Sequence, residues 1–231
     1  MRVIVIEGHS GTGKTITGGQ LCVELRRRGL NVVYIPEHGH YLNPMLGQWV
    51  RHHATQNERR RTGDFIWLAA ERQRMAYLMR ASARGVDAAV VDTSLLSIVA
   101  YELGKYRLDR LALDKALLRA VASYLEDTEE RPAVLWAFLQ APCQTILERL
   151  ASRGGTRDVL ISPQVISTLN EFRRRFASGW LTGHSYTNWE SPVNPQALAD
   201  WMLSAQSSCS AQYDRTALLN TIRTLLEMEL Q

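Results

Sequence analysis

The strongest constraint on this chain is a glycine-rich loop that directly follows an apolar segment near the N-terminus. Residues 3–6 read Val-Ile-Val-Ile, and the loop consists of Gly8, His9, Ser10, Gly11, Thr12, Gly13, Lys14 and Thr15. Loop glycines let successive backbone N–H groups point at one anion, and a helix start adds partial positive charge there. In this spacing the lysine reaches the β- and γ-phosphates and the threonine hydroxyl ligates Mg²⁺. The sequence therefore predicts a strand, a phosphate-binding loop and a helix that hold a nucleoside triphosphate.

Beyond the loop, strand-like and helix-like segments alternate along the chain. Strands are expected at 2–7, 31–35, 88–92, 132–139 and 186–189, and helices at 14–28, 45–61, 65–84, 94–103, 108–125, 143–152, 163–178, 195–204 and 211–229. Gly63 and Asp64 are expected to start the third helix, and Ser162 and Pro163 to start the seventh. This alternation predicts an α/β fold with a five-stranded parallel sheet and helices on both faces.

Length, charge and cysteine content narrow the class of protein. A chain of 231 residues suits one α/β domain with a helical elaboration. No apolar run is long enough to span a bilayer, and Met1-Arg2 leads directly into the first strand, so neither a membrane protein nor a signal peptide is expected. Three widely spaced cysteines predict a reduced, cytoplasmic setting. The net charge of +4 favours anionic ligands without establishing nucleic-acid binding.

Side chains suited to phosphoryl transfer fall where ligands bind such sheets, at the carboxyl ends of the strands. Asp92 ends the third strand and is the candidate to hold Mg²⁺ together with Thr15, although a helix N-cap is the structural alternative. Glu37 ends the second strand, either as a base or orienting group for an acceptor hydroxyl or as a solvated loop acid. Arginines that cover the transferred group are expected around a Gly-Gly turn, at Arg149, Arg153 and Arg157.

Several segments in the middle of the chain form a recognisable series. Residues 68–72 read Leu-Ala-Ala-Glu-Arg, residues 84–92 read Arg-Gly-Val-Asp-Ala-Ala-Val-Val-Asp, and residues 97–101 read Ser-Ile-Val-Ala-Tyr. They are similar to the Ala-x-Arg helix, the G-x-x-V-[IV]-x-D-R strand and the S-x-x-A-Y-Q helix of thymidylate kinases. Leu139 to Pro142, followed by Glu148, Arg149 and Arg153, is similar to a strand and lid of the same group. The chain thus resembles the P-loop kinases of the thymidylate kinase and deoxynucleoside kinase group over roughly residues 1–200.

The resemblance implies a P-loop kinase fold with a helical lid, ATP as donor with Mg²⁺, and Arg72 facing the acceptor pocket. Residues 1–207 would form the kinase domain, with an acceptor-binding helical region at about 38–84 and the lid at about 149–162. Residues 208–231 would add a C-terminal helix packed on the same domain. Members of the group are often dimeric, so a homodimer is left open.

The acceptor side departs from the resembled group at two positions. Thymidylate kinases carry T-R-E-P-G after the second strand and D-R after the third, whereas this chain has Pro36 and Thr93 at the arginine positions. Without such bidentate partners a doubly charged phosphate is poorly held, so the acceptor is expected to lack one there. Deoxynucleoside kinases keep an arginine in E-R-S and use a glutamate, here Glu37, as base for a sugar hydroxyl. The expected acceptor residues are Glu37, His38, Tyr41, Arg72 and Asp92.

Four functions follow from these observations. The first is ATP-dependent transfer of the γ-phosphoryl to a hydroxyl of a nucleoside-like or other small molecule. The second is a kinase acting on a hydroxyl carried by DNA, such as a hydroxymethylpyrimidine or a strand end, with arginines at 51, 59–61 and 173–175 on the backbone. The third is a nucleoside monophosphate kinase in which the 59–61 run replaces the missing arginines. The fourth is a nucleotide-binding regulatory protein without kinase activity.

Overall fold

The computed structural model describes residues 1–41, 56–100, 115–127, 134–152, 162–181, 186–205, 216, 219–220 and 222–224. The described residues form one five-stranded sheet, all parallel, in the order β2-β3-β1-β4-β5. Its strands are β1 (Arg2–Gly8), β2 (Val32–Ile35), β3 (Ala88–Asp92), β4 (Val134–Gln140) and β5 (Tyr186–Glu190). The first strand, β1, therefore lies at the centre of the sheet, with β3 and β2 on one side of it and β4 and β5 on the other. This arrangement confirms the five-stranded parallel sheet and places the carboxyl ends of β1 and β3 side by side.

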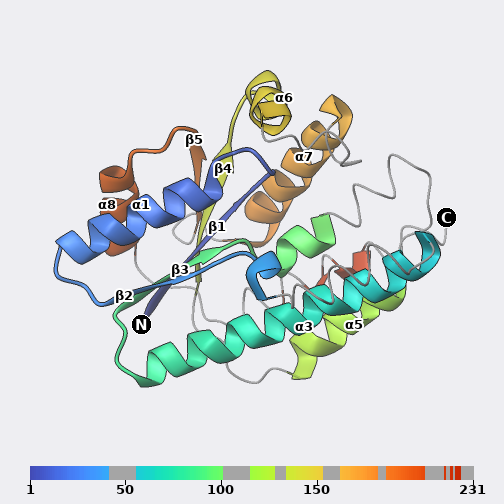
Figure 1. Ribbon diagram of the computed structural model, residues 1–231, viewed down its shortest axis with the longest axis horizontal. Helices are drawn as coiled ribbons and strands as arrows, with labels where there is room; N and C mark the ends of the chain where they lie inside the picture. The colour runs from blue at the N-terminus through green and yellow to red at the C-terminus, as the bar shows by residue number, and fades with distance from the viewer. Residues whose placement is uncertain are drawn as a thin grey trace.

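Helices cover both faces of the sheet, as the sequence predicts (Figure 1). They are α1 (Lys14–Arg27), the 3₁₀ helix η1 (His38–Tyr41), α3 (Gln56–Ala83), α5 (Lys115–Asp127), α6 (Cys143–Ser152), α7 (Pro163–Trp180) and α8 (Pro195–Ser204). In addition, residues 95–100 are helical. Helices α1 and α8 lie on one face, and α3, α5 and α7 contribute to the core on the other. Within the described residues, no helix combines the length and apolarity needed to cross a bilayer.

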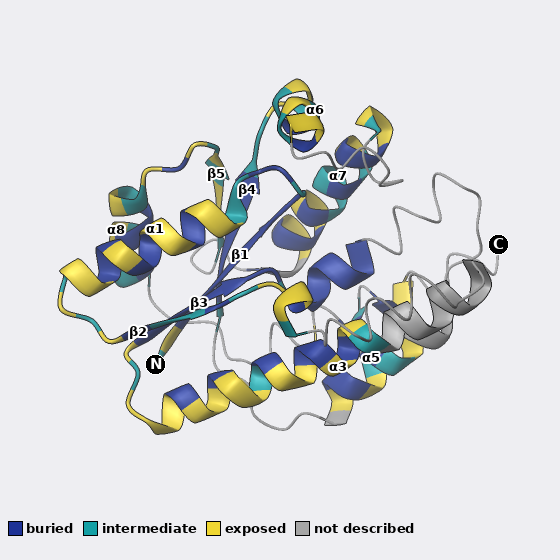
Figure 2. Ribbon diagram, viewed as in Figure 1, coloured by how far each residue is buried: buried dark blue, intermediate teal, exposed yellow. Residues whose placement is uncertain are grey.

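Strand β1 shows how both faces of the sheet are filled (Figure 2). Val3 and Val5 pack into the apolar cluster that also holds side chains of α3, α5 and α7. Ile4 and Ile6 point to the other face and pack with side chains of α1 and α8. All four side chains are at most 5% exposed. An uninterrupted apolar run such as residues 3–6 is what a parallel strand buried on both faces requires.

One prediction about the helices is wrong. The sequence predicts helices at 45–61 and 65–84 with a start at Gly63 and Asp64, but α3 runs without interruption from Gln56 to Ala83. A glycine inside a helix costs about 1 kcal/mol relative to alanine, and packing offsets this cost. Helix α3 as a whole contacts η1, β2 and α5, and such packing is able to offset the cost of one glycine.

Two predicted features lie largely outside the described residues. The lid at 149–162 is described only where α6 ends and where Ser162 precedes α7, and Arg153 and Arg157 fall between these points. The C-terminal helix at 208–231 is described only in part. Its Leu219 and Ile222 are buried in the same cluster as side chains of α5. The domain boundaries stay a prediction.

Helix α1 carries a buried acid whose charge stabilises the fold. The Glu24 side chain is 4% exposed and accepts hydrogen bonds from Arg27 at 2.9 Å and Arg28 at 2.8 Å. These bonds lower the pKa of Glu24 from the ordinary 4.5 to about 2. A carboxyl with a depressed folded-state pKa stabilises the fold above the unfolded value and loses that contribution as the pH falls through the folded value.

Replacing Glu24 by glutamine is therefore expected to lower the Tm at neutral pH, and the difference should shrink as the pH falls from 4.5 to about 2. Thermal unfolding followed by circular dichroism across this pH range measures the difference. The matched control is Glu126→Gln, because Glu126 is exposed and lies 3.4 Å from Arg223, so its loss should change the Tm little at any pH. A Tm difference for Glu24→Gln that is constant with pH would contradict the assignment.

Candidate active site

The loop between β1 and α1 adopts a shape that its glycines allow. Gly11 and Gly13 have φ angles of 85° and 90°, in the left-handed region that favours glycine. At Gly8 an added Cβ would lie 2.6 Å from the carbonyl oxygen of Leu139 on β4, so a larger residue would push the loop off the neighbouring strand. The hydroxyl and the N–H of Thr12 donate to the carbonyl of His9 at 2.8 and 3.2 Å, which closes the loop.

Two further loop residues lie close to the backbone of the loop itself. His9 is 2% exposed, and its Nδ1 lies 2.8 Å from the carbonyl oxygen of Ser10. The ammonium of Lys14 donates to the carbonyl oxygens of Gly8 and His9 at 3.1 and 3.2 Å. Burial lowers the pKa of Lys14 below the ordinary 10.5, while the charges of Asp92, Glu7 and Glu37 oppose that change. The loop lysine therefore lies near three carboxylates at the carboxyl end of the sheet.

The structure brings together the two residues predicted to hold Mg²⁺. Asp92 ends β3 in register with Ile6 of β1, and its side chain is fully buried. Its Oδ2 accepts a hydrogen bond from the Thr15 hydroxyl at 2.7 Å and another from the Tyr34 hydroxyl at 2.9 Å. Its Oδ1 is buried as well, and no group among the described residues donates to it.

The oxygen atoms of Asp92 and Thr15 fit a magnesium ion. A buried carboxylate oxygen without a protein donor, next to a threonine hydroxyl, leaves one acceptor for the metal or for one of its waters. Mg²⁺ in nucleotide sites is bound by one or two carboxylates plus substrate phosphates and keeps several waters, so a complete protein cage is not needed. Within the described part of the chain, no group of three or more His, Cys, Asp or Glu side chains could hold a metal ion.

On the acceptor side, the residues that follow β2 lead into a buried polar network. Glu37 is exposed, whereas His38 is 5% exposed and its Nε2 lies 3.0 Å from the Glu71 carboxylate. Arg74 of α3 is fully buried, and its Nη1 donates to Glu71 at 2.9 Å and lies 2.8 Å from His38 Nε2. Its Nη2 donates to the carbonyl oxygens of Asp92 and Thr93 at 2.7 and 2.8 Å. Arg74 thus connects η1 and α3 to the end of β3.

The other predicted acceptor residues make contacts of their own. Arg72 is exposed, and its guanidinium lies over the ring of Tyr124 on α5, 5.5 Å from the centroid. Tyr41 is partly buried against the core, and burial raises its pKa. Thr93, beside the buried polar network, has a φ of 66°, a conformation that β-branched residues rarely adopt. Its N–H donates to the carbonyl oxygen of Ile6 at 3.0 Å. The roles of Arg72, His38 and Tyr41 toward an acceptor stay predictions.

Sequence reasoning missed Tyr34 and Arg74, although both leave a signal. Tyr34 is the hydroxyl-bearing residue in a strand that is otherwise aliphatic. Arg74 stands between Ala70 and Leu78 at helical spacing, so it puts a charge in the middle of an apolar stripe. A charged or hydroxyl side chain on a core-facing stripe is buried only with partners. Tyr34 and Arg74 each have a partner at the end of β3, and Arg74 also contacts Glu71 and His38.

The arginines on the lid side of the loop take different places. Arg149 donates through Nη1 to the carbonyl of Gly11 at 3.0 Å and to the Ser191 hydroxyl at 3.1 Å, which joins the loop to the segment after β5. The sequence singles out Arg173 only as part of a run of arginines on α7, but its side chain is 5% exposed and its Nε lies 3.7 Å from the Glu7 carboxylate. Its charge also lowers the pKa of Lys14, so it belongs to the surroundings of the loop.

The neighbours of Arg173 face solvent. Arg174 and Arg175 are exposed and pair with Glu171 of the same helix at 2.8 and 2.7 Å. The side chains of the other predicted nucleic-acid contacts, the arginines at 51 and 59–61, lie outside the described residues. The arginine run on α7 is therefore divided between one buried member and two exposed ones.

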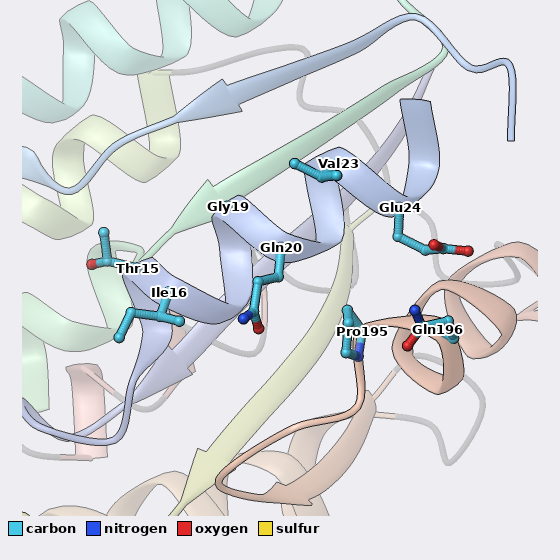
Figure 3. Close-up of a pocket in the computed structure, with 8 residues that line it drawn as sticks. All are labelled: Thr15, Ile16, Gly19, Gln20, Val23, Glu24, Pro195 and Gln196. Carbon is cyan, nitrogen blue, oxygen red and sulfur yellow. The ribbon is translucent and has the colours of Figure 1, made fainter. Parts of the chain in front are cut away.

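A separate cleft of about 470 Å³ lies along the outer side of α1, beside the start of α8 (Figure 3). Its lining residues are Thr15, Ile16, Gly19, Gln20, Val23, Glu24, Pro195 and Gln196. Ile16 and Val23 are 61% and 65% exposed, so this side of α1 offers apolar surface. Of the predicted site residues the cleft includes only Thr15, whose hydroxyl is engaged by Asp92.

Comparison with known proteins places the fold. No family model and no curated protein sequence matches the chain. The chain is similar to a structure of deoxyadenosine kinase from M. mycoides with bound dATP, at 17% identity and a TM-score of 0.60, over 87% of this chain and 97% of that one. A structure of deoxyadenosine kinase from M. mycoides with the products dCMP and a flexible dCDP is similar at 16% identity and a TM-score of 0.59, over 87% and 96%. At this identity the similarity shows a shared fold, and it confirms the P-loop kinase fold that the sequence predicts.

Proposed function

We propose that this chain is a kinase that transfers the γ-phosphoryl group of ATP to a hydroxyl of a nucleoside-like small molecule. The observation that carries the proposal is the hydrogen bond of 2.7 Å between Thr15 and Asp92. It brings a hydroxyl of the phosphate-binding loop to a buried carboxylate from the neighbouring strand. The fold shared with deoxyadenosine kinases supports the same chemistry and a nucleoside as acceptor.

The loop and its lysine would bind the phosphates of the donor. The ammonium of Lys14 donates to two loop carbonyls, and phosphate oxygens are stronger, charged acceptors for the same protons. Thr15 and Asp92 would hold Mg²⁺, which neutralises phosphate charge when it is bound. Arg149 supports the loop through Gly11 and, with Arg153, is proposed to lie over the transferred group.

Glu37 would act on the acceptor hydroxyl. The carboxylate is exposed just after the end of β2, and its charge acts on Lys14, where it opposes the fall in pKa that burial causes. As the hydroxyl oxygen bonds to the γ-phosphorus, its proton passes to Glu37 and ADP leaves with the electron pair of the broken bond. A positioned base of this kind accelerates transfer by about 10²- to 10⁴-fold.

The geometry favours an acceptor without a phosphate at this place. Thr93 stands where the resembled kinases carry an arginine, and it is 7% exposed. Within the described residues, Arg74 reaches the end of β3. Its two terminal nitrogens already contact Glu71 and the carbonyl oxygens of Asp92 and Thr93. A phosphate would have to compete with these buried partners.

Transfer of labelled γ-phosphate from Mg-ATP tests the proposal. The acceptors compared are nucleosides, their monophosphates, hydroxylated antibiotics, and oligonucleotides that carry a free 5′-hydroxyl or a hydroxymethylpyrimidine. We expect label on a nucleoside-like molecule, with kcat/KM at least about tenfold above that of its monophosphate. Label on the monophosphate would contradict the acceptor assignment. Label on oligonucleotides alone, with a KM that rises steeply with salt, would favour the nucleic-acid alternative.

A further inference from the structure

We propose that Tyr34 is a positioning residue for Asp92, which it holds so that Oδ1 stays available to the Mg²⁺ of the bound nucleotide. The inference rests on the proposed function, because it concerns the same metal site. Tyr34 lies on β2, so it reaches Asp92 from an element that belongs neither to the phosphate-binding loop nor to β3.

The pattern of donors at Asp92 is asymmetric. Thr15 and Tyr34 donate to the same oxygen, Oδ2, at 2.7 and 2.9 Å, and among the described residues nothing donates to Oδ1. Two donors that reach one oxygen from different elements oppose rotation of the carboxylate, which would exchange the two oxygens. The Thr15 hydroxyl is itself a predicted ligand of the metal, so Tyr34 is the donor whose task is limited to orientation.

The ring of Tyr34 is held by α1. A Cβ added at Gly18 would lie 2.8 Å from Cε2 of Tyr34, so the absence of a side chain at Gly18 is what lets the ring reach Asp92. The ring also packs against the apolar cluster between the sheet and α1.

The next helix residue provides a matched control. A Cβ added at Gly19 would have no heavy atom within 4 Å, so Gly19→Ala adds the same methyl group to the same helix without touching Tyr34. Tyr186 provides the matched control for the Tyr34→Phe change. It lies on β5 with its ring 6.4 Å from Phe138, and Tyr186→Phe removes a hydroxyl far from Asp92 along the sheet.

The test measures how strongly Mg²⁺ tightens binding of the ATP analogue AMP-PNP, by isothermal titration calorimetry with and without the metal. The ratio of the two Kd values isolates the metal site, because a general structural loss would weaken both measurements alike. We expect Tyr34→Phe and Gly18→Ala to reduce this ratio about tenfold, the size of effect typical for partners of metal-ligating groups. Gly19→Ala and Tyr186→Phe should keep the native ratio, and Asp92→Asn should reduce it at least as much as Tyr34→Phe.

The outcomes separate this inference from the proposed function. A native ratio in Tyr34→Phe, together with a reduced ratio in Asp92→Asn, would overturn the role of Tyr34 and leave the metal site in place. Equal weakening of both Kd values in Tyr34→Phe would make Tyr34 a structural residue and would also overturn the inference. A native protein whose AMP-PNP affinity does not respond to Mg²⁺ would overturn the proposed metal site itself. Tyr34→Phe keeps the ring that packs against Gly18. It therefore tests the role of the Tyr34 hydroxyl even if the Gly18→Ala variant does not fold.

Discussion

Replacing Lys14 by methionine is expected to reduce kcat at least about 10²- to 10³-fold, the usual cost of removing one group that stabilises developing charge. The ammonium is held at the loop by the carbonyls of Gly8 and His9, 3.1 and 3.2 Å away, where the donor's phosphates are proposed to bind. Burial lowers the pKa of Lys14, so the folded state disfavours its charge, and loss of that charge should not unfold the protein. Steady-state turnover with the best acceptor and a thermal melt measure both effects.

The control for Lys14→Met is Lys115→Met. Lys115 is the first residue of α5, and its replacement changes the net charge by the same amount. Turnover of the Lys115 variant should equal that of the native protein. Retention of more than a tenth of the native kcat in Lys14→Met would show that the loop is not where the phosphoryl group is transferred.

Replacing Glu37 by glutamine is expected to reduce kcat about 10²- to 10⁴-fold, because the amide cannot accept the proton of the acceptor hydroxyl. The KM for ATP should stay near the native value, since Glu37 is exposed at the end of β2 and is not part of the phosphate-binding loop. The change keeps the size of the side chain, so the Tm should change little. Initial rates at varied ATP and varied acceptor separate the two constants.

Glu126→Gln is the charge-matched control for this experiment as well. Glu126 is exposed on α5, lies 3.4 Å from Arg223 and is not among the predicted site residues. Its variant should turn over at the native rate. An unchanged kcat in Glu37→Gln would remove Glu37 from the chemistry and leave proton transfer to water or to another group.

The features that the sequence predicts correctly depend on local signals. The loop glycines, the apolar run at residues 3–6 and the start of α7 each depend on a few neighbouring residues. At α7 the Ser162 side chain accepts a hydrogen bond from the N–H of Val165, and Pro163 takes the first helical position, as expected. The end of β3 is predictable in the same way, because an acid after four apolar residues falls at a fixed edge of the sheet.

The features that the sequence could not predict depend on distant contacts. Tyr34 and Asp92 are 58 positions apart, and Arg74 and His38 are 36 apart, so no local pattern shows that they meet. The same reason explains Gly63, whose low helix propensity is overridden by the packing of α3. The sequence predicts that His38 lines the acceptor pocket, and its burial against Glu71 and Arg74 follows only from the placement of α3 over the end of β2.

Arg74 has a consequence for how the two substrates would influence one another. One end of its guanidinium contacts Glu71 and His38, next to the proposed base, and the other end donates to the carbonyl oxygens of Asp92 and Thr93. A rigid planar group that spans both places transmits a displacement of either one. Under the proposed function, Arg74 would therefore join the nucleotide half of the site to the acceptor half through one buried side chain.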